Sequence, residues 1–265
     1  MNAKVSSQIV RKSRVADDFG QAAARYDEVA RLQRQVGEQL MTRLRPGEAG
    51  HVLDLGCGTG YFLPRLLEAL APAQLTASDL SPGMIRYARE QRGVAADWLV
   101  ADAESLPLGD ASVDQVFSSL MIQWCSDPVA VLREVRRVLK PGGEAVFSTL
   151  TDGTLHELRE AWAQADPGVE HVNQFRSRSE YEQLIKSVFD HAGIESVPLT
   201  FWYPDAMALL HELKELGARY KDEGRRAGVT APGRFRRLKQ AYEQWRDPAK
   251  GLPATWQVAF IHIQG

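Results

Sequence analysis

The sequence predicts an α/β fold built on one mostly parallel sheet with helices on both faces. Short apolar runs alternate with stretches of helical periodicity between residues 51 and 150. The first run, 51–55, is apolar enough for a strand that is buried on both faces. Three glycines, Gly56, Gly58 and Gly60, follow it directly and indicate a tight strand-to-helix turn. Right-handed crossovers between parallel strands then place helices on both faces of the sheet.

Composition narrows the class of protein. A chain of 265 residues with 44% hydrophobic residues can hold one large domain, or one such domain with a lid. The net charge of −2 argues against a protein that binds nucleic acid through bulk electrostatics. The two cysteines, Cys57 and Cys125, form neither a disulfide framework nor a metal-ligand spacing. The first residues lack an apolar run of signal-peptide length, so we expect a soluble, cytoplasmic protein. The six histidines are dispersed without metal-binding spacing, so we expect no metal site.

A long helical pattern precedes the first strand. Apolar residues recur every three or four positions over residues 15–44, and Gly20 and Gly37 are places where this helix is expected to break. One interpretation is a helix packed on the edge of the sheet. The other is a lid over a ligand, with Tyr26 and Gln33 facing inward.

The ends of the first two strands carry carboxylates. Asp54 lies just before the glycine loop, whose G-x-G-x-G spacing differs from the dinucleotide motif G-x-G-x-x-G. A carboxylate there would repel a pyrophosphate and suits a ligand with a cationic end. A helix over 61–70 and a strand over 74–78 follow. Asp79 then lies about 20 residues beyond the glycine loop, where nucleotide-binding folds hold ribose hydroxyls.

The next connection adds a second nucleotide-like feature. Ser81 is the expected N-cap of a helix in which Met84 either lies against an adenine ring or fills the core, the commoner role of a methionine. A strand over 94–101 ends at Asp102 and Ala103. The Asp102 carboxylate either accepts a hydrogen bond from an adenine amine or belongs to an ordinary loop.

The remaining strands of this half complete one rim. We expect a strand over 113–119, a helix over 128–140 capped by Asp127, and a strand over 144–150. Open α/β sheets bind ligands at the carboxyl ends of their strands. This edge collects four polar side chains: Asp54, Asp79, Asp102 and Gln123.

The C-terminal part of the chain has a looser pattern. Two helices and two strands are expected there: 155–164, 179–192, 194–203 and 255–264. The irregular stretch 166–178 and the helical, charged stretch 204–253 lie between them. The latter contains a basic segment, 225–239, which begins at Arg225 and ends at Lys239. Such a segment is either a solvated face or a docking surface for an acidic partner.

These motifs together resemble the class I S-adenosylmethionine (SAM) methyltransferases over residues 45–150. The resemblance implies a seven-stranded Rossmann-like α/β sheet whose last strand inserts antiparallel. It also implies a methyltransferase domain over 45–265, an N-terminal helical lid over 1–44, and a helical insertion at about 204–252 before the last strand. The motifs that carry it are Asp54-x-Gly56-x-Gly58-x-Gly60, Asp79, Asp102-Ala103 and the turn 139–143.

The same resemblance implies S-adenosyl-L-methionine as the cofactor. The three glycines would lie close to its methionine part, Asp79 at the ribose, and Asp102 with Ala103 at the adenine. The full set of expected cofactor-binding residues is Gln33, Asp54, Gly56, Gly58, Gly60, Asp79, Leu80, Met84, Asp102, Ala103 and Ser118.

Segments outside the core resemble a narrower family, the malonyl-[acyl-carrier protein] O-methyltransferases of biotin synthesis (BioC). The resembling segments are 19–27, Leu32-Gln33, 121–125, 171–175, 213–218 and 252–256. That family methylates the free carboxylate of a malonyl thioester, which begins pimeloyl synthesis. The resemblance implies malonyl-acyl carrier protein, or malonyl-coenzyme A, as the partner, with neither nucleic acid nor membrane involved. We expect the carrier protein to dock on the basic segment 225–239.

The expected substrate side contains positioning groups rather than a base. A malonyl carboxylate is ionised at neutral pH, so its oxygen needs no general base to attack a methyl group. Trp124 and Phe175 are expected as apolar walls. The residues expected to position the substrate are Tyr26, Gln123, Asn173, Arg176 and Lys214.

Three alternatives remain open from the sequence. The core motifs also suit a methyltransferase that acts on another small acid or on a quinone precursor. A nicotinamide-dependent oxidoreductase is disfavoured by the glycine spacing and by Asp54. A SAM-binding regulator without catalysis would have the same core.

Overall fold

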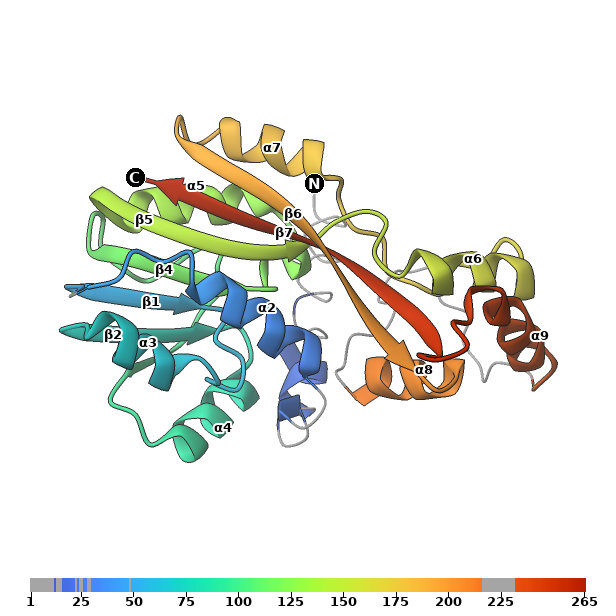
Figure 1. The fold of residues 1–265 in the computed structure, drawn as a ribbon. Coiled ribbons are helices and arrows are strands. Elements are labelled where there is room, and N and C mark those ends of the chain that lie inside the picture. The colour runs from blue at the N-terminus through green and yellow to red at the C-terminus, as the bar shows by residue number, and fades with distance from the viewer. Residues whose placement is uncertain are drawn as a thin grey trace, which may run out of the picture. The chain divides into compact units, whose positions relative to one another are not determined.

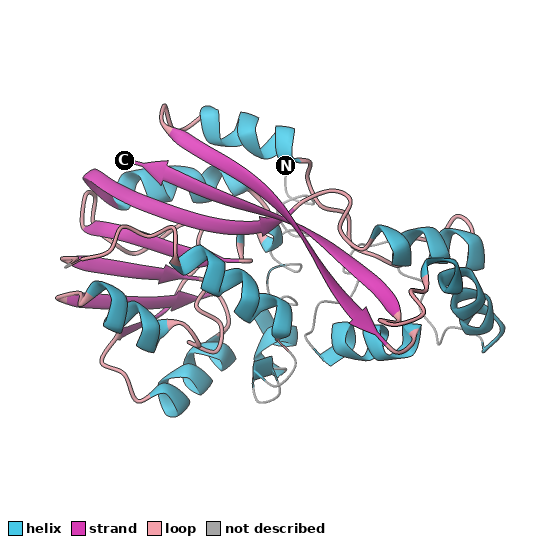
Figure 2. Cartoon of the chain, viewed as in Figure 1, coloured by secondary structure: helices cyan, strands magenta, loops and turns pink. Residues whose placement is uncertain are grey.

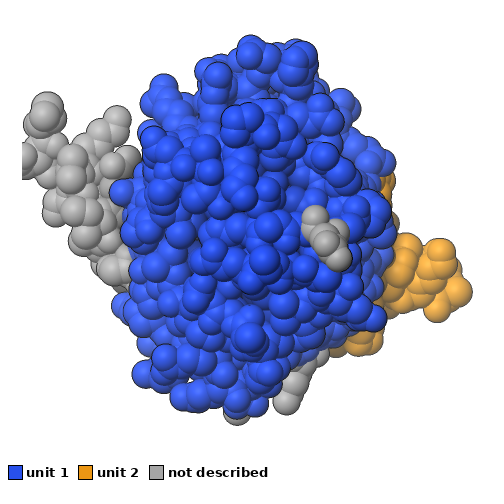
Figure 3. Space-filling model, turned by 90° about the vertical axis from the view of Figure 1, so that its left-hand side faces the viewer, with its two compact units in different colours: residues 1–149, 178–195, 259–265 blue, residues 150–177, 196–258 orange. Residues whose placement is uncertain are grey.

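The computed structural model describes the following residues: Lys12, 16–21, Ala23, 26–27, 30–47, 49–215 and 232–265. The chain divides into two compact units, which Figure 3 colours separately. Unit 1 comprises residues 1–149, 178–195 and 259–265, and unit 2 comprises residues 150–177 and 196–258. Each unit is described by itself.

A seven-stranded sheet has the order β3-β2-β1-β4-β5-β7-β6 (Figures 1 and 2). The strands are β1 (His51–Leu55), β2 (Gln74–Asp79), β3 (Asp97–Val100), β4 (Val113–Ser119), β5 (Leu139–Leu150), β6 (Ala192–Tyr203) and β7 (Leu252–Gln264). The first five pair in parallel, with Leu53 opposite both Thr76 and Val116. Every residue of β1 is buried, as a central parallel strand requires.

The last strand runs antiparallel to its neighbours. The Gly265 N–H donates to Gly143, and the Thr151 N–H donates to Gln257, so the residue number rises along β5 as it falls along β7. Figure 1 shows the arrow of β7 opposed to those of β5 and β6. The seven-stranded mixed sheet that the core motifs imply is confirmed.

Eight α-helices have bounds that the structure defines. In unit 1 they are α2 (Arg31–Met41), α3 (Leu63–Leu70), α4 (Pro82–Arg92), α5 (Pro128–Val138) and α7 (Arg178–Lys186). In unit 2 they are α6 (His156–Ala165), α8 (Ala206–Glu215) and α9 (Pro232–Tyr242). The short 3₁₀ helices are η1 (Ile122–Trp124) and η2 (Glu243–Trp245). Helices α2, α3 and α4 cover one face of the sheet in unit 1, and α5 and α7 cover the other (Figure 1). No described helix is long and apolar enough to cross a bilayer.

The expected caps of α4 and α5 are confirmed. The Ser81 hydroxyl accepts a hydrogen bond from the Met84 N–H at 3.4 Å. The Asp127 carboxylate accepts from the N–H groups of Val129 and Ala130, at 3.0 and 3.2 Å. Both helices have proline in the first turn, where no backbone donor is needed.

The helical stretch expected over 15–44 is interrupted, but not at the glycines where a break is expected. Ala30, with φ −79° and ψ 47°, lies outside helical geometry, and α2 begins only after it. Gly20 and Gly37 are both helical, so the expectation that they break the helix is wrong. Gly37 instead allows a close approach, because a Cβ there would overlap the Phe62 ring.

Several element boundaries differ from the sequence expectation. Strand β3 has only four residues, and α7 ends at Lys186 because the chain enters β6 at Ala192. Strand β5 begins at Leu139, five residues before the expected start. Leu139 pairs with Val113 and Glu144 with Gln115, so the residues between Leu139 and Glu144 form a bulge within the ladder.

The core of unit 1 lies between the sheet and the helices α5 and α7. Phe147 on β5, Val135 on α5 and Tyr181 on α7 are almost fully buried in one apolar cluster. In unit 2, Trp162 on α6 meets Phe235 on α9 edge to face, with ring centroids 6.1 Å apart. Apolar burial of this kind is the main favourable term for both units.

Candidate active site

A cavity lies at the carboxyl ends of β1 to β4 in unit 1. The space within it is about 860 Å³, a volume that includes open solvent at its mouth. Its walls come from the glycine loop, from the loops after β2, β3 and β4, and from the N-terminal segment. Eight of the residues that the sequence predicts for cofactor or substrate line it: Tyr26, Gly56, Gly58, Asp79, Leu80, Met84, Asp102 and Ala103.

The three glycines of the loop have left-handed backbones but different surroundings. Their φ angles are +79° at Gly56, +53° at Gly58 and +72° at Gly60. A Cβ on Gly56 would overlap the Met121 side chain, and one on Gly60 would lie 2.9 Å from Leu63 Cδ1. A Cβ on Gly58 would meet nothing within 4 Å. Gly56 and Gly60 therefore serve packing, whereas Gly58 leaves backbone open to a ligand in the cavity.

Asp79 is held at the end of β2 by the backbone. One carboxylate oxygen accepts from the Gly58 N–H at 2.9 Å and the other from the Ser81 N–H at 2.8 Å. Burial raises the pKa of Asp79, although these backbone hydrogen bonds lower it in part. The carboxylate is thus oriented before any ligand arrives. Its remaining lone pairs are available to two neighbouring hydroxyl donors.

Asp54 is buried, with 2% of its surface exposed, and it does not line the cavity. Burial and the negative charge of Asp79 raise the pKa of Asp54 to about 8. Within the described part of the chain no cation forms an ion pair with Asp54. A cationic ligand beside it would favour the ionised form and lower this pKa again.

Tyr26 and Gln33 form a second polar group on the N-terminal side. Tyr26 lines the cavity and is hydrogen-bonded to Gln33, which does not line it. Burial raises the pKa of Tyr26, so the phenol stays protonated at neutral pH. The Oε1 atom of Gln33 is buried without a hydrogen-bond partner among the described residues. It is an acceptor that a ligand could satisfy.

The loop after β3 forms the other end of the cavity. The Asp102 carboxylate accepts from the Glu104 N–H at 3.0 Å. Lys12 Nζ lies 2.6 Å from Asp102 Oδ2 and 2.7 Å from Glu104 Oε2. Met84 and Ala103 are buried beside them and give this end an apolar wall. Sequence reasoning did not single out Lys12 or Glu104.

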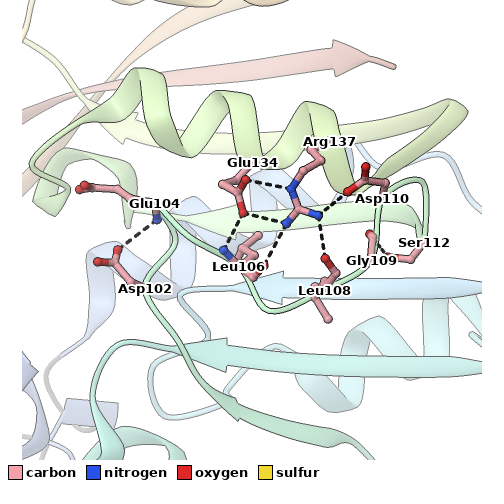
Figure 4. Close-up of polar contacts among 9 residues, drawn as sticks. All are labelled: Asp102, Glu104, Leu106, Leu108, Gly109, Asp110, Ser112, Glu134 and Arg137. Carbon is pink, nitrogen blue, oxygen red and sulfur yellow. Dashed lines mark hydrogen bonds and ion pairs between the residues drawn. The ribbon is translucent and has the colours of Figure 1, made fainter.

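Arg137 on α5 clamps this loop from behind, as Figure 4 shows. Its guanidinium donates to the carbonyls of Leu106 and Leu108 at 2.9 and 2.7 Å, and to Asp110 Oδ1 at 2.7 Å. It also donates to both oxygens of Glu134, one of which accepts from the Leu106 N–H. These contacts fix the loop that carries Asp102. Sequence reasoning missed this clamp because only the i,i+3 spacing of Glu134 and Arg137 on the helix hinted at it.

Two predicted residues of unit 1 contact the chain rather than the cavity. The Gln123 amide donates to the Leu120 carbonyl at 2.7 Å, and its oxygen accepts from Thr149 Oγ1 at 3.1 Å. The Ser118 hydroxyl is fully buried and donates to the Leu55 carbonyl at 2.7 Å. Their contacts tie neighbouring strand ends together.

The other predicted substrate residues, Asn173, Arg176 and Lys214, belong to unit 2. Asn173 is half-buried, and the side chains of Arg176 and Lys214 are exposed.

The stretch that carries Asn173 is tied to its own unit. The His171 ring stacks on Trp162, with centroids 3.9 Å apart, and its Nε2 lies 3.0 Å from Asp166. Arg234 on α9 also pairs with Asp166, at 3.2 Å. This cluster holds the irregular stretch against α6 and α9, so Asn173 is presented from a fixed backbone.

Comparison with known proteins shows to which protein family the chain belongs. The family described as "Methyltransferase domain" matches residues 53–147. The malonyl-[acyl-carrier protein] O-methyltransferase of Hahella chejuensis is 42% identical over 250 residues, which cover 94% of this chain and 89% of that one. The chain belongs to the malonyl-[acyl-carrier protein] O-methyltransferase family. The malonyl-[acyl-carrier protein] O-methyltransferase of Erwinia pyrifoliae is also 42% identical, over 95% of this chain and 92% of that protein.

Some relatives of this O-methyltransferase family are longer. The biotin biosynthesis bifunctional protein BioHC of Cellvibrio japonicus is 44% identical over 95% of this chain. The chain spans about half the length of such bifunctional relatives: 50% of the C. japonicus protein and 47% of the one from Teredinibacter turnerae.

Solved structures agree on the fold of this O-methyltransferase family member. A putative methyltransferase of Bacillus halodurans superposes with a TM-score of 0.61 at 14% identity, over 86% of this chain and 97% of that one. The putative methyltransferase in the Haloferax volcanii Trm112 complex gives 0.58 at 20% identity, over 92% and 96%. The class I methyltransferase fold that the core motifs imply is confirmed.

Proposed function

We propose that the chain transfers a methyl group from SAM to the free carboxylate of a malonyl thioester on acyl-carrier protein. The product is the malonyl methyl ester that starts pimeloyl synthesis for biotin. The observation that carries this proposal is the 42% identity along 89% of the H. chejuensis malonyl-[acyl-carrier protein] O-methyltransferase. That likeness extends beyond the methyltransferase domain match at 53–147 and so includes the regions expected to hold the substrate.

The cavity of unit 1 supports SAM as the methyl donor. Gly58 offers open backbone, and Asp79 has lone pairs left for two ribose hydroxyls. Asp102 offers an acceptor for the adenine amine. Asp54 and Gln33 do not line the cavity, but both are acceptors that would suit an ammonium group, and Gln33 Oε1 has no partner among the described residues. SAM carries the three groups that these acceptors would hold: ribose hydroxyls, an adenine amine and an ammonium. A dinucleotide would bring a pyrophosphate toward Asp54 instead.

The chemistry requires positioning rather than proton transfer. When bound, SAM supplies a methyl on sulfonium whose carbon–sulfur bond breaks as the carboxylate oxygen forms its bond to carbon. The malonyl carboxylate is already ionised, and no proton moves. Tyr26 stays protonated, so it can donate a hydrogen bond to that carboxylate or to a bound water but does not act as a base. Phe19 and Trp124, with ring centroids 5.4 Å apart, add apolar surface that helps to exclude water.

For the substrate side we propose Tyr26, Gln123, Asn173, Arg176 and Lys214. Arg176 or Lys214 would supply the cation that attracts the malonyl carboxylate. A full bidentate clamp would reduce the reactivity of the attacking oxygen, so one cationic contact is expected. Gln123 would act by holding the loop after β4, because its amide is bound at both ends within the chain.

We also propose that the acidic carrier protein docks on the basic insertion. Residues 225–231 of the basic segment lie outside the described residues. On α9, Arg234 pairs with Asp166, and Arg237 donates to the Ala165 carbonyl at 2.9 Å. Arg236 and Lys239 are exposed and lie three residues apart, on one face of the helix. These two are the described cations best suited to an acidic partner.

The test is methyl transfer to a set of thioesters. The chain is incubated with SAM and, in turn, malonyl-carrier protein, malonyl-coenzyme A and acetyl-carrier protein, and each product is followed by intact mass. A gain of one methyl on the malonyl thioesters alone is expected. SAM binding without methylation of any malonyl thioester would refute the proposal and favour a methyltransferase of another small acid.

A further inference from the structure

The described residues of the N-terminal segment contact the loops around the cavity in unit 1. These residues are Lys12, 16–21, Ala23 and 26–27. The Ala16 carbonyl accepts from Ser81 Oγ, after β2, at 2.7 Å. Phe19 meets Trp124, after β4, edge to face at 5.4 Å. Lys12, Ala16, Phe19 and Tyr26 all line the cavity. The described residues of this segment therefore form part of the cavity wall.

Two groups of charged contacts hold the segment near its ends. At the glycine loop, Asp27 accepts from Thr59 Oγ1 at 2.6 Å and pairs with Arg92 of α4. At the loop after β3, Lys12 pairs with Asp102 and Glu104. Of these two groups, only the contacts of Lys12 line the cavity.

The two carboxylates that bind Lys12 are each held in place by a backbone N–H group, unlike those of a typical surface ion pair. One oxygen of Asp102 is already taken by the Glu104 N–H, and one oxygen of Glu104 accepts from the Ser126 N–H at 2.7 Å. The two remaining oxygens both lie within 2.7 Å of Lys12 Nζ. The side chains of Lys12 and Glu104 are only 20% and 14% exposed, so solvent screens this pair less than a surface pair.

We propose that Lys12 is the residue that retains the cofactor, by fastening the N-terminal segment over the adenine end of the cavity. One ammonium between the two carboxylates offsets their mutual repulsion beside the bound adenine. Asp102 can still accept from the adenine amine, because a carboxylate oxygen has two lone pairs. Release of the cofactor then requires the Lys12 contacts to break, so Lys12 acts mainly on the dissociation rate. This inference rests on the proposed use of SAM at this site.

The test measures S-adenosylhomocysteine binding to the full chain and to Lys12→Met, which keeps side-chain length without charge. We expect the dissociation rate and the Kd to rise about tenfold, with the association rate nearly unchanged. Lys12→Arg should restore most of the retention, since its guanidinium can bridge both carboxylates. Thermal melting of the ligand-free protein should change little, whereas a merely structural role would lower it.

Lys140→Met is the matched control. Lys140 also forms an ion pair, with Asp114 at 2.7 Å, but it lies in the bulge near the start of β5 and does not line the cavity. This variant should bind S-adenosylhomocysteine like the parent. An unchanged or lower Kd in Lys12→Met would overturn the inference, and a lower value would mean that Lys12 competes with adenine. Failure of the parent chain to bind S-adenosylhomocysteine would instead refute the proposed function.

Discussion

At the scale of single residues, the most informative feature is a buried carboxylate, Asp54, that has no cation partner among the described residues. The pKa of Asp54 rises from 3.8 to about 8 on folding, because of burial and the nearby Asp79. The folded chain therefore holds a proton that the unfolded chain releases. The stability contributed by this group falls as pH rises from about 4 to about 8 and then levels off. The burial cost of this carboxylate is consistent with a binding role for a cationic ligand.

The first prediction concerns Asp54→Asn. Below about pH 8 the parent should release a proton when S-adenosylhomocysteine binds, because the ligand ammonium favours the ionised carboxylate. Its affinity should rise with pH and level off near 8. The variant should lose this proton release and bind S-adenosylhomocysteine at least about tenfold more weakly. Its free energy of unfolding at pH 7 should be about 1 kcal/mol higher than that of the parent, because the neutral amide costs less to bury. Calorimetry in two buffers of different ionisation heat measures the proton.

Asp190→Asn, an exposed carboxylate on the same unit, is the control and should behave like the parent. Proton release that persists in Asp54→Asn would assign the titration to another group, Asp79 being the nearest candidate.

The second prediction concerns the Arg137 clamp of Figure 4. Arg137→Lys cannot reproduce a planar fork that reaches two carbonyls and two carboxylates. We expect about 2 kcal/mol lower free energy of unfolding in denaturant titrations, together with faster amide exchange in the loop 102–112. Arg133→Lys, an exposed arginine on the same helix, should change neither. Equal effects of the two substitutions would contradict the clamp.

At the scale of elements, the sequence predicts the parallel core well. Burial on both faces makes β1 a mostly apolar run, and the capping residues Ser81 and Asp127 mark the starts of α4 and α5. The bulge in β5 is less visible, because ladder pairing through Lys140-Pro141-Gly142-Gly143 depends on β4 beside it rather than on local preference. The same holds within the site. Strand ends predict Asp79 and Asp102, but the contacts of Lys12 and Arg137 join segments far apart in sequence.

Gly37 supplies a third prediction. Alanine usually stabilises the interior of a helix by about 1 kcal/mol relative to glycine. In α2 the added methyl would overlap the Phe62 ring, so Gly37→Ala should instead lower the free energy of unfolding by about 1 to 3 kcal/mol. The double variant Gly37→Ala, Phe62→Leu should recover part of that loss. A stabilised single variant would show that α2 does not lie on Phe62.

At the scale of the whole molecule, the proposed cofactor site lies in unit 1. The proposed cations for the malonyl carboxylate and for the carrier protein belong to unit 2.

The fourth prediction concerns the docking of the carrier protein on α9. Arg236→Glu with Lys239→Glu should raise the KM for malonyl-carrier protein about tenfold and weaken its salt dependence. The KM for malonyl-coenzyme A should change much less. Lys186→Glu, an exposed lysine of unit 1, is the matched charge reversal and should leave both values unchanged.

The most direct test of the central claim is to locate the transferred methyl group. The chain is supplied with SAM labelled with carbon-13 in its methyl group and with malonyl-carrier protein, and the product is examined by NMR. We expect a single labelled methyl resonance typical of a carboxylic methyl ester, whose protons show a long-range correlation to an ester carbonyl carbon. A label on carbon or nitrogen, or a label that stays on SAM while acetyl- and malonyl-carrier proteins remain unchanged, would contradict this claim.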